Sequence, residues 1–230
     1  MERLADPATR ARIEDEIDAS GRDWSTVMVG GTWSDENRQY SGKTIAEIMR
    51  QETSDVFAAS SQVSRLSPSP GALVCEILVR DGCKTGAFFF GMSEENLAKI
   101  YSQPWIVPGS DASLRAPWGP LGADHPHPRA YGTMPEFYRR VRALGFSREE
   151  TIARMTSVPA RRFGIRGRGV LERGAFADIV VWSEGEFASA ATYVEPHKFA
   201  SGVKCVMVNG TVPYANGSFT GERGGRFLEP

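Results

Sequence analysis

Histidine and cysteine are scarce in this chain of 230 residues. It contains three of each, and they form no HExxH helix, no CxxC pair and no HxH pair on a predicted strand. His125 and His127 do read His-Pro-His, but they lie in a proline-rich loop. Because no carboxylate cluster replaces them, the sequence does not supply the ligands that a zinc site requires.

Charge imbalance and long apolar runs are also absent. The 27 basic and 28 acidic residues give a net charge of -1, so nothing electrostatic points to nucleic acid or to an anionic membrane as a partner. The apolar runs are far too short to span a bilayer, and the first residues are densely charged, unlike a signal peptide.

The three cysteines, Cys75, Cys83 and Cys205, are odd in number and widely spaced, which favours reduced thiols and a cytoplasmic protein.

The most informative part of the sequence lies between Trp105 and Thr133. A short apolar run, 105–107, predicts a buried strand and leads into Gly109-Ser110-Asp111; His127-Pro128-Arg129 follows after a loop rich in proline and glycine. A carboxylate just after the C-terminal end of a strand is where barrel enzymes place their chemistry. The loop is able to return an arginine over the same mouth.

This stretch resembles the N-acyl-D-amino-acid deacylases (D-aminoacylases) of the amidohydrolase superfamily, whose pattern is GSDG, then HPR, then GT ahead of a helix. Further segments also resemble that family. They are MTSVPARRFG (155–164), the ADIVV stretch within 169–181, VMVNG (206–210), RLADP (3–7) and YSGKTIAEI (40–48). The similarity therefore extends over most of the chain and is weakest between residues 51 and 90.

The resemblance implies an α/β fold: the C-terminal part of an amidohydrolase (β/α)8 barrel over residues 1–165, with a lid insertion at about 30–90, and strands of a small β-sandwich over 166–230. Capping residues and periodicity predict helices at 6–19, from 44, at 93–101, 135–144 and 148–155. From residue 169 the pattern alternates, which predicts strands at 170, 179–182, 203–208 and 212–214. Asn209-Gly210 predicts a hairpin turn between two of them, and Asn216-Gly217 a second turn.

Asp111 and Arg129 are the candidate chemical residues. By the resemblance, Asp111 takes a proton from the metal-activated water, passes it to the leaving amine, and in a binuclear site also serves as a ligand of the second metal. Arg129 binds the substrate α-carboxylate with two parallel hydrogen bonds. The alternatives are a turn-forming aspartate and a surface ion pair. The family has glycine after the aspartate, whereas this chain has Ala112, which would tilt the carboxylate if that position needs a positive φ.

The polar loop at 30–40 supplies the other candidates. In the family this region provides hydroxyls for the α-carboxylate and, in members with acidic substrates, an arginine for the side chain. Ser34 and Tyr40 match the first role and Arg38 the second. His127 is expected to tie its loop together rather than to contact substrate.

The family's metal ligands, an HxH, a Cys and two further His, have no counterpart here. We therefore expect a zinc-dependent amidohydrolase that hydrolyses an amide C–N bond of an N-acyl-D-amino acid as a heteromer. This chain would supply Asp111 and Arg129, be inactive alone, and depend on a partner chain for the Zn²⁺ ligands. Two alternatives stay open: a non-catalytic scaffold or regulatory subunit, and a hydrolase of a cyclic amide or imide. A free-standing serine hydrolase built on Ser110 is disfavoured because no GxSxG elbow is present.

Overall fold

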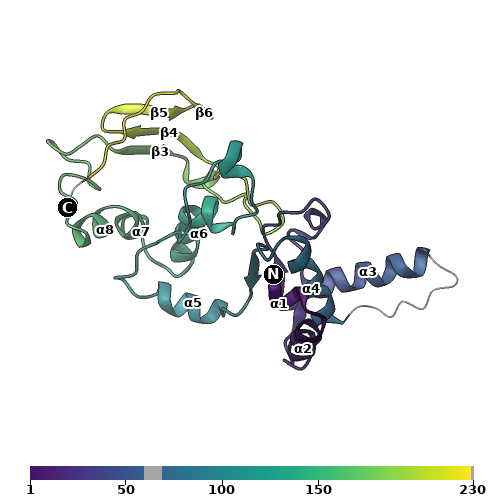
Figure 1. Cartoon of the computed structure of the whole chain (residues 1–230). Helices are drawn as coiled ribbons and strands as arrows, with labels where there is room; N and C mark the ends of the chain where they lie inside the picture. The colour runs from purple at the N-terminus through teal and green to yellow at the C-terminus, as the bar shows by residue number, and fades with distance from the viewer. Residues whose placement is uncertain (60–68, 229–230) are drawn as a thin grey trace. The chain divides into compact units, whose positions relative to one another are not determined.

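A computed structural model describes residues 1–59 and 69–228 of the chain. The fold is mixed α/β, and its contacts group into two compact units (Figure 1). Unit 1 comprises residues 1–91, 115–127 and 192–197; unit 2 comprises residues 92–114, 128–191 and 198–230. This grouping interleaves segments of the chain, so the division into 1–165 and 166–230 remains a prediction.

Unit 1 consists mainly of helices. Its main elements are α1 (Glu2–Ala5), α2 (Pro7–Asp18), β1 (Val27–Val29), α3 (Ile45–Ala59), α4 (Pro70–Arg80) and β2 (Ala87–Phe89), with short 3-10 turns at Trp24–Thr26, Arg38–Tyr40 and Gly119–Gly122. The predicted start of α2 is confirmed: the Asp6 carboxylate accepts a hydrogen bond from the Thr9 amide at 2.8 Å, and Pro7 is the first helical residue. Such a cap satisfies an amide that the helix itself leaves unpaired.

The core of unit 1 combines β1 with the helices α3 and α4 that follow it in the chain. Val27 and Val29 of β1 pack with Ile48 of α3 and with Leu73 and Ile77 of α4. The last turns of α3 fall within the range expected for the lid insertion, and residues 60–68 of that range lie outside the described residues. The strand β2 lies in the same range; it pairs antiparallel with β1, and the side chain of its Phe89 is mostly exposed.

Unit 2 places helices on one face of an antiparallel sheet (Figure 1). The helices are α5 (Glu94–Tyr101), α6 (Arg129–Ala143), α7 (Arg148–Met155) and α8 (Ser157–Arg162). Ser93 caps α5, and Ser147 and Glu150 form the predicted capping box of α7. The helix expected from Pro135 begins six residues earlier, at Arg129, so Gly132 and Pro135 lie inside it.

The sheet has the order β3 (Ile179–Trp182), β4 (Val203–Val208), β5 (Thr211–Ala215) and β6 (Ser218–Phe219), and every pair is antiparallel; a 3-10 turn, Glu184–Glu186, follows β3. Both predicted turns are confirmed. Asn209 and Gly210 have φ values of 50° and 81°, and Asn216 and Gly217 have 52° and 82°. Two successive positive φ values are the mark of a type I′ hairpin, which matches the twist of its strands. Val170, predicted as a strand, is not in one.

The apolar run before Asp111 does not form the expected strand. The carbonyl of Ile106 instead accepts a hydrogen bond at 2.7 Å from Arg154 of α7, whose guanidinium also donates to the Tyr101 carbonyl at 3.0 Å. Arg154 is 3% exposed and stacks between the rings of Phe137 and Phe146. The segment that leads to Asp111 is therefore fixed by a buried side chain rather than by a neighbouring strand. Burial lowers the pKa of Arg154, because removal from water disfavours the charged form.

A candidate active site around Asp111 and Arg129

Asp111 and Arg129, both in unit 2, lie against each other. Nη2 of Arg129 donates to Oδ2 of Asp111 at 2.9 Å, and Nε of Arg129 donates to the Asp111 carbonyl at 3.2 Å. Arg129 is the first residue of α6. The Asp111 side chain remains 89% exposed and that of Arg129 44% exposed. The structure thus brings the two predicted residues together and leaves the carboxylate open to solvent.

The backbone of Asp111 is in the left-handed region, with φ of 45°. A residue other than glycine costs roughly 1–3 kcal/mol in that region and occurs there mainly where function or the surroundings require it. Ala112 does not have a positive φ, so the condition under which alanine at this position would strain the turn is not met. The left-handed residue is the aspartate itself, a type that tolerates this conformation comparatively well.

The loop at 30–40, in unit 1, is organised by Asp81, a residue that the sequence analysis missed. The Asp81 carboxylate is buried and accepts hydrogen bonds from the amide of Ser34 at 2.9 Å, the side chain of Asn37 at 2.8 Å and the hydroxyl of Thr85 at 2.7 Å. Burial opposes ionisation of Asp81, yet these hydrogen bonds hold its pKa below the usual value. The signal available in the sequence was a lone carboxylate at the end of an apolar helix.

The predicted substrate-binding residues of this loop have partners within unit 1. The Ser34 hydroxyl accepts from the Asn37 amide at 3.2 Å, and Arg38 pairs with Asp35 at 2.8 Å. Tyr40 is 3% exposed, belongs to the unit 1 core, and donates to Glu52 at 2.5 Å. Burial and this hydrogen bond raise the pKa of Tyr40. Their assignment to substrate stays a prediction, and the geometry gives each of them a structural bond already.

His125 and His127 tie a loop of unit 1 together. Nε2 of His127 is 2.9 Å from the Tyr193 hydroxyl, and Nε2 of His125 is 2.5 Å from the Tyr193 carbonyl. Phe88 packs against the rings of His127 and Tyr193, with centroids 5.5 and 5.6 Å apart. Burial, with the nearby charge of His125, lowers the pKa of His197. These contacts give the histidines a packing role.

The described part of the chain does not fit a zinc ion by itself. Over residues 1–59 and 69–228, no three side chains of histidine, cysteine, aspartate or glutamate gather closely enough to bind one. Asp111 is a single carboxylate bonded to an arginine. A catalytic zinc site needs three protein ligands, so no step of the reaction can be routed through zinc held by these residues alone.

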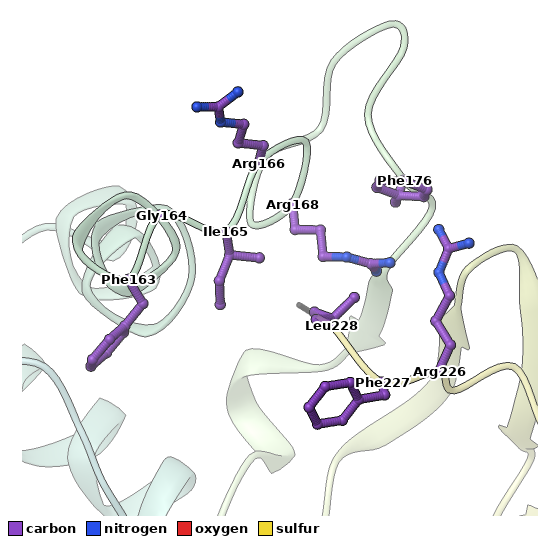
Figure 2. A pocket seen from close by; sticks show the side chains of 9 residues that line it. All are labelled: Phe163, Gly164, Ile165, Arg166, Arg168, Phe176, Arg226, Phe227 and Leu228. Atoms are coloured by element: carbon purple, nitrogen blue, oxygen red, sulfur yellow. The ribbon is translucent and has the colours of Figure 1, made fainter. Parts of the chain in front are cut away.

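Two cavities of unit 2 differ in their chemistry. The larger, about 1130 Å³, is lined by arginine, phenylalanine and aliphatic residues (Figure 2). Arg168 and Arg226 point toward the Phe176 ring there, 4.2 and 4.7 Å from its centroid, and Arg168 is also bonded to Asp178 and Asn209. Among the described residues, those that line it include no acid and no nucleophile. The second cavity, about 590 Å³, lies between α6, α7 and the sheet, and Ser110 and Arg129 line it.

Comparison with known proteins places this geometry in a family. The amidohydrolase family model matches residues 44–214. Among curated proteins, D-aminoacylase of Alcaligenes xylosoxydans xylosoxydans is 37% identical over 145 residues, and N-acyl-D-aspartate deacylase of the same organism is 32% identical over 203 residues. These matches cover 62% and 86% of this chain, but 28% and 35% of those proteins.

Solved structures agree with the sequence relatives. A D-aminoacylase with a binuclear metal centre superposes with a TM-score of 0.66 at 29% identity, over 94% of this chain and 40% of that protein. N-acyl-D-glutamate deacylase of Bordetella bronchiseptica, in complex with zinc and a phosphonate inhibitor, superposes with a TM-score of 0.62 at 27% identity, over 90% and 37%. The chain spans about a third of the length of the curated relatives that it matches. Its resemblance to the deacylases is confirmed, and the chain belongs to the amidohydrolase family.

Proposed function

We propose that this chain is the part of a zinc-dependent amidohydrolase that carries the proton-transfer carboxylate and the substrate-carboxylate arginine, acting on N-acyl-D-amino acids. The observation that carries the proposal is the solvent-open Asp111 carboxylate, held on a left-handed residue and bridged by the first residue of α6. The deacylase relatives supply the reaction class. The chain contributes as a subunit or as a segment of the complete enzyme.

Hydrolysis adds water across the amide bond. The water oxygen bonds to the acyl carbon, the C–N bond breaks, and a proton reaches the amine nitrogen, which leaves a carboxylate and a free amine. Asp111 accepts the proton from water and returns it to the nitrogen. Arg129 presents a planar pair of donors that match a carboxylate. Because Arg129 already bonds Asp111, a substrate carboxylate that takes over Nη2 releases the base at the moment of binding.

Zinc would be held by residues outside this sequence, on a partner chain or on the remainder of the enzyme. Such an ion polarises an amide carbonyl and makes water more acidic. One zinc-bound relative and one with a binuclear centre support this choice of metal. The chain alone is then inactive, because Asp111 has no activated water to deprotonate.

The test is reconstitution. The chain is assayed for release of free amine from an N-acyl-D-amino acid, first alone and then with a chain that carries HxH, Cys and His ligands. We expect activity only in the mixture, with zinc present, and loss on chelation. Full activity of the isolated chain would contradict the split assignment. An active mixture that tolerates Asp111→Asn would favour the role of a non-catalytic scaffold. A preference for cyclic amides would mean that the substrate is a cyclic amide and not an N-acyl-D-amino acid.

A further inference from the structure

We propose that the 590 Å³ cavity beside Arg129 binds a medium-length apolar acyl chain, of about eight to ten carbons, so that the site prefers N-acyl amino acids with long acyl groups. The assignment of this ligand to a reaction rests on the proposed function. The assignment of the cavity as a binding site for apolar carboxylates does not depend on the proposed function.

The composition of the cavity wall indicates an elongated apolar ligand with a charged end. Arg129 and Ser110 line it together with apolar residues, among them Met134 of α6, Met155 of α7 and Val206 of β4. Small-molecule sites typically have volumes of about 300–1000 Å³ and combine a mostly apolar wall with a few polar groups that fix orientation. A carboxylate or amide at the Arg129 end and an apolar tail behind it match this arrangement.

The length of the cavity selects an acyl chain over an amino-acid side chain. Its lining follows α6 from Arg129 to Tyr138, which is roughly 13 Å at about 1.5 Å per residue. A covalent chain advances about 1.2 Å per bond, since three backbone bonds span about 3.5 Å. A methionine side chain would therefore fill only about 5 Å of it, whereas eight to ten carbons would fill most of it.

Two contacts support α6 against the sheet side of unit 2, one beside each end of the cavity. Near Arg129, Gly132 lies so close to the Ser189 hydroxyl that a Cβ at Gly132 would be 2.2 Å from it. At the far end Tyr138 packs edge-on against Trp182 and Phe187, with ring centroids 5.0 and 5.9 Å apart. Because both contacts set the spacing, the space between them is part of the fold.

Strand β3 offers a matched pair of variants. Val180 lines the cavity, and its neighbour Val181 does not; both are 53% exposed, and successive strand residues point to opposite faces. Val180→Phe should fill the cavity. Val181→Phe makes the same chemical change on the other face and controls for general damage to the strand.

The first experiment is calorimetric titration of the full chain with butyrate, octanoate and decanoate. In the wild type and in Val181→Phe, affinity should rise about threefold to fourfold per added methylene up to about ten carbons. In Val180→Phe this increase should disappear. Affinity that does not depend on chain length, or equal behaviour of the two variants, would overturn the proposal.

The second experiment compares kcat/KM in the reconstituted enzyme. N-decanoyl-D-alanine should exceed N-acetyl-D-alanine at least tenfold in the wild type and in Val181→Phe, and Val180→Phe should remove this advantage. N-acetyl-D-2-aminodecanoate carries the same tail on the amino-acid side, and its selection instead would overturn the acyl assignment. Hydrolysis of N-acetyl-D-alanine without any chain-length preference would sink this inference and leave the proposed function standing. Decanoate binding without hydrolysis of any amide would support the cavity as a binding site and contradict the proposed function.

Discussion

Within the described residues, two exposed aspartate–arginine pairs have nearly equal lengths and differ in almost everything else. Arg38 and Asp35 of unit 1 are 2.8 Å apart, three residues apart in sequence, with side chains 75% and 88% exposed. Arg129 and Asp111 of unit 2 are 2.9 Å apart and join a helix start to a distant turn. Only the second pair has a left-handed aspartate and a second hydrogen bond from the arginine side chain, which runs from Nε to the Asp111 carbonyl.

The difference shows that an ion-pair distance says little about function. A local, exposed pair such as Arg38–Asp35 contributes at most a few tenths of a kcal/mol to stability. Holding a non-glycine residue in the left-handed region costs energy that the surroundings must offset. The Asp111 turn therefore has a conformation that the chain maintains against its own preference, which is the expected sign of a site rather than of a surface contact.

The largest expected effect comes from removing the charge on Asp111. In the reconstituted enzyme Asp111→Asn should lower kcat by about 10²–10⁴, the usual loss for one positioned general base, with assembly and zinc content near normal. Asp35→Asn, which breaks the other pair, should change kcat less than about twofold. Steady-state kinetics with metal analysis of both variants checks this, and similar losses in the two would remove the distinction between the pairs.

The next effect concerns the buried carboxylate that orders the loop at 30–40. Asp81→Ala leaves the amide of Ser34 without its acceptor and leaves the Asn37 side-chain nitrogen only the Ile77 carbonyl, so the free energy of unfolding should fall by about 2–4 kcal/mol. Asp81→Asn keeps an acceptor oxygen and should cost less. Denaturant titration gives both values, and a loss below about 0.5 kcal/mol for Asp81→Ala would show that water replaces the carboxylate.

Asp81 also gives the stability of unit 1 a pH dependence. Its pKa is lower in the folded chain than its ordinary value of 3.8. The unfolded chain therefore binds the proton more readily, and stability falls as the pH drops below about 4 and through the folded pKa. The wild type should lose more stability than Asp81→Asn over this range.

A smaller effect separates the two arginines. Arg129→Lys keeps the charge but loses the planar pair of donors, so KM should rise about tenfold, more than kcat falls. Arg38→Lys should leave KM for a substrate with an apolar side chain within about twofold. An unchanged KM in Arg129→Lys, beside an inactive Asp111→Asn, would point to a substrate without a free carboxylate, such as a cyclic amide.

Local rules predicted much of the fold. The caps at Asp6, Ser93 and Ser147 and the turns at Asn209 and Asn216 are all present, because each depends on atoms within a few residues. The predicted strand at 105–107 and the predicted helix start at Pro135 were wrong for a common reason: both depend on distant partners. Ile106 is held by Arg154, and the early turns of α6 include Gly132 at its contact with Ser189.

The site divides in the same way. The motif brought out Asp111 and Arg129, and the structure places them in contact. The resemblance suggested Ser34 and Tyr40 for the substrate carboxylate; the structure bonds them to Asn37 and Glu52, and their assignment to substrate stays a prediction. The sequence signal for Asp81 and Arg154 was too weak to predict their roles, because a lone buried charge depends on donors and carbonyls elsewhere in the chain.

The smallest expected effect is that of Ala112→Gly, which tests which residue of the turn at Asp111 is strained. The family pattern places glycine after the aspartate, and this chain has Ala112. Because the positive φ is at Asp111 and not at Ala112, Ala112→Gly should relieve nothing. It should change kcat/KM less than about threefold and cost at most about 0.5–1 kcal/mol of stability, through the greater backbone freedom of glycine in the unfolded chain. Asp111→Gly removes both the carboxylate and the strain, so it should be as inactive as Asp111→Asn and yet more stable. A large gain in activity from Ala112→Gly would mean that the working enzyme moves the left-handed residue to position 112, and the Arg129–Asp111 pair would then describe a resting state.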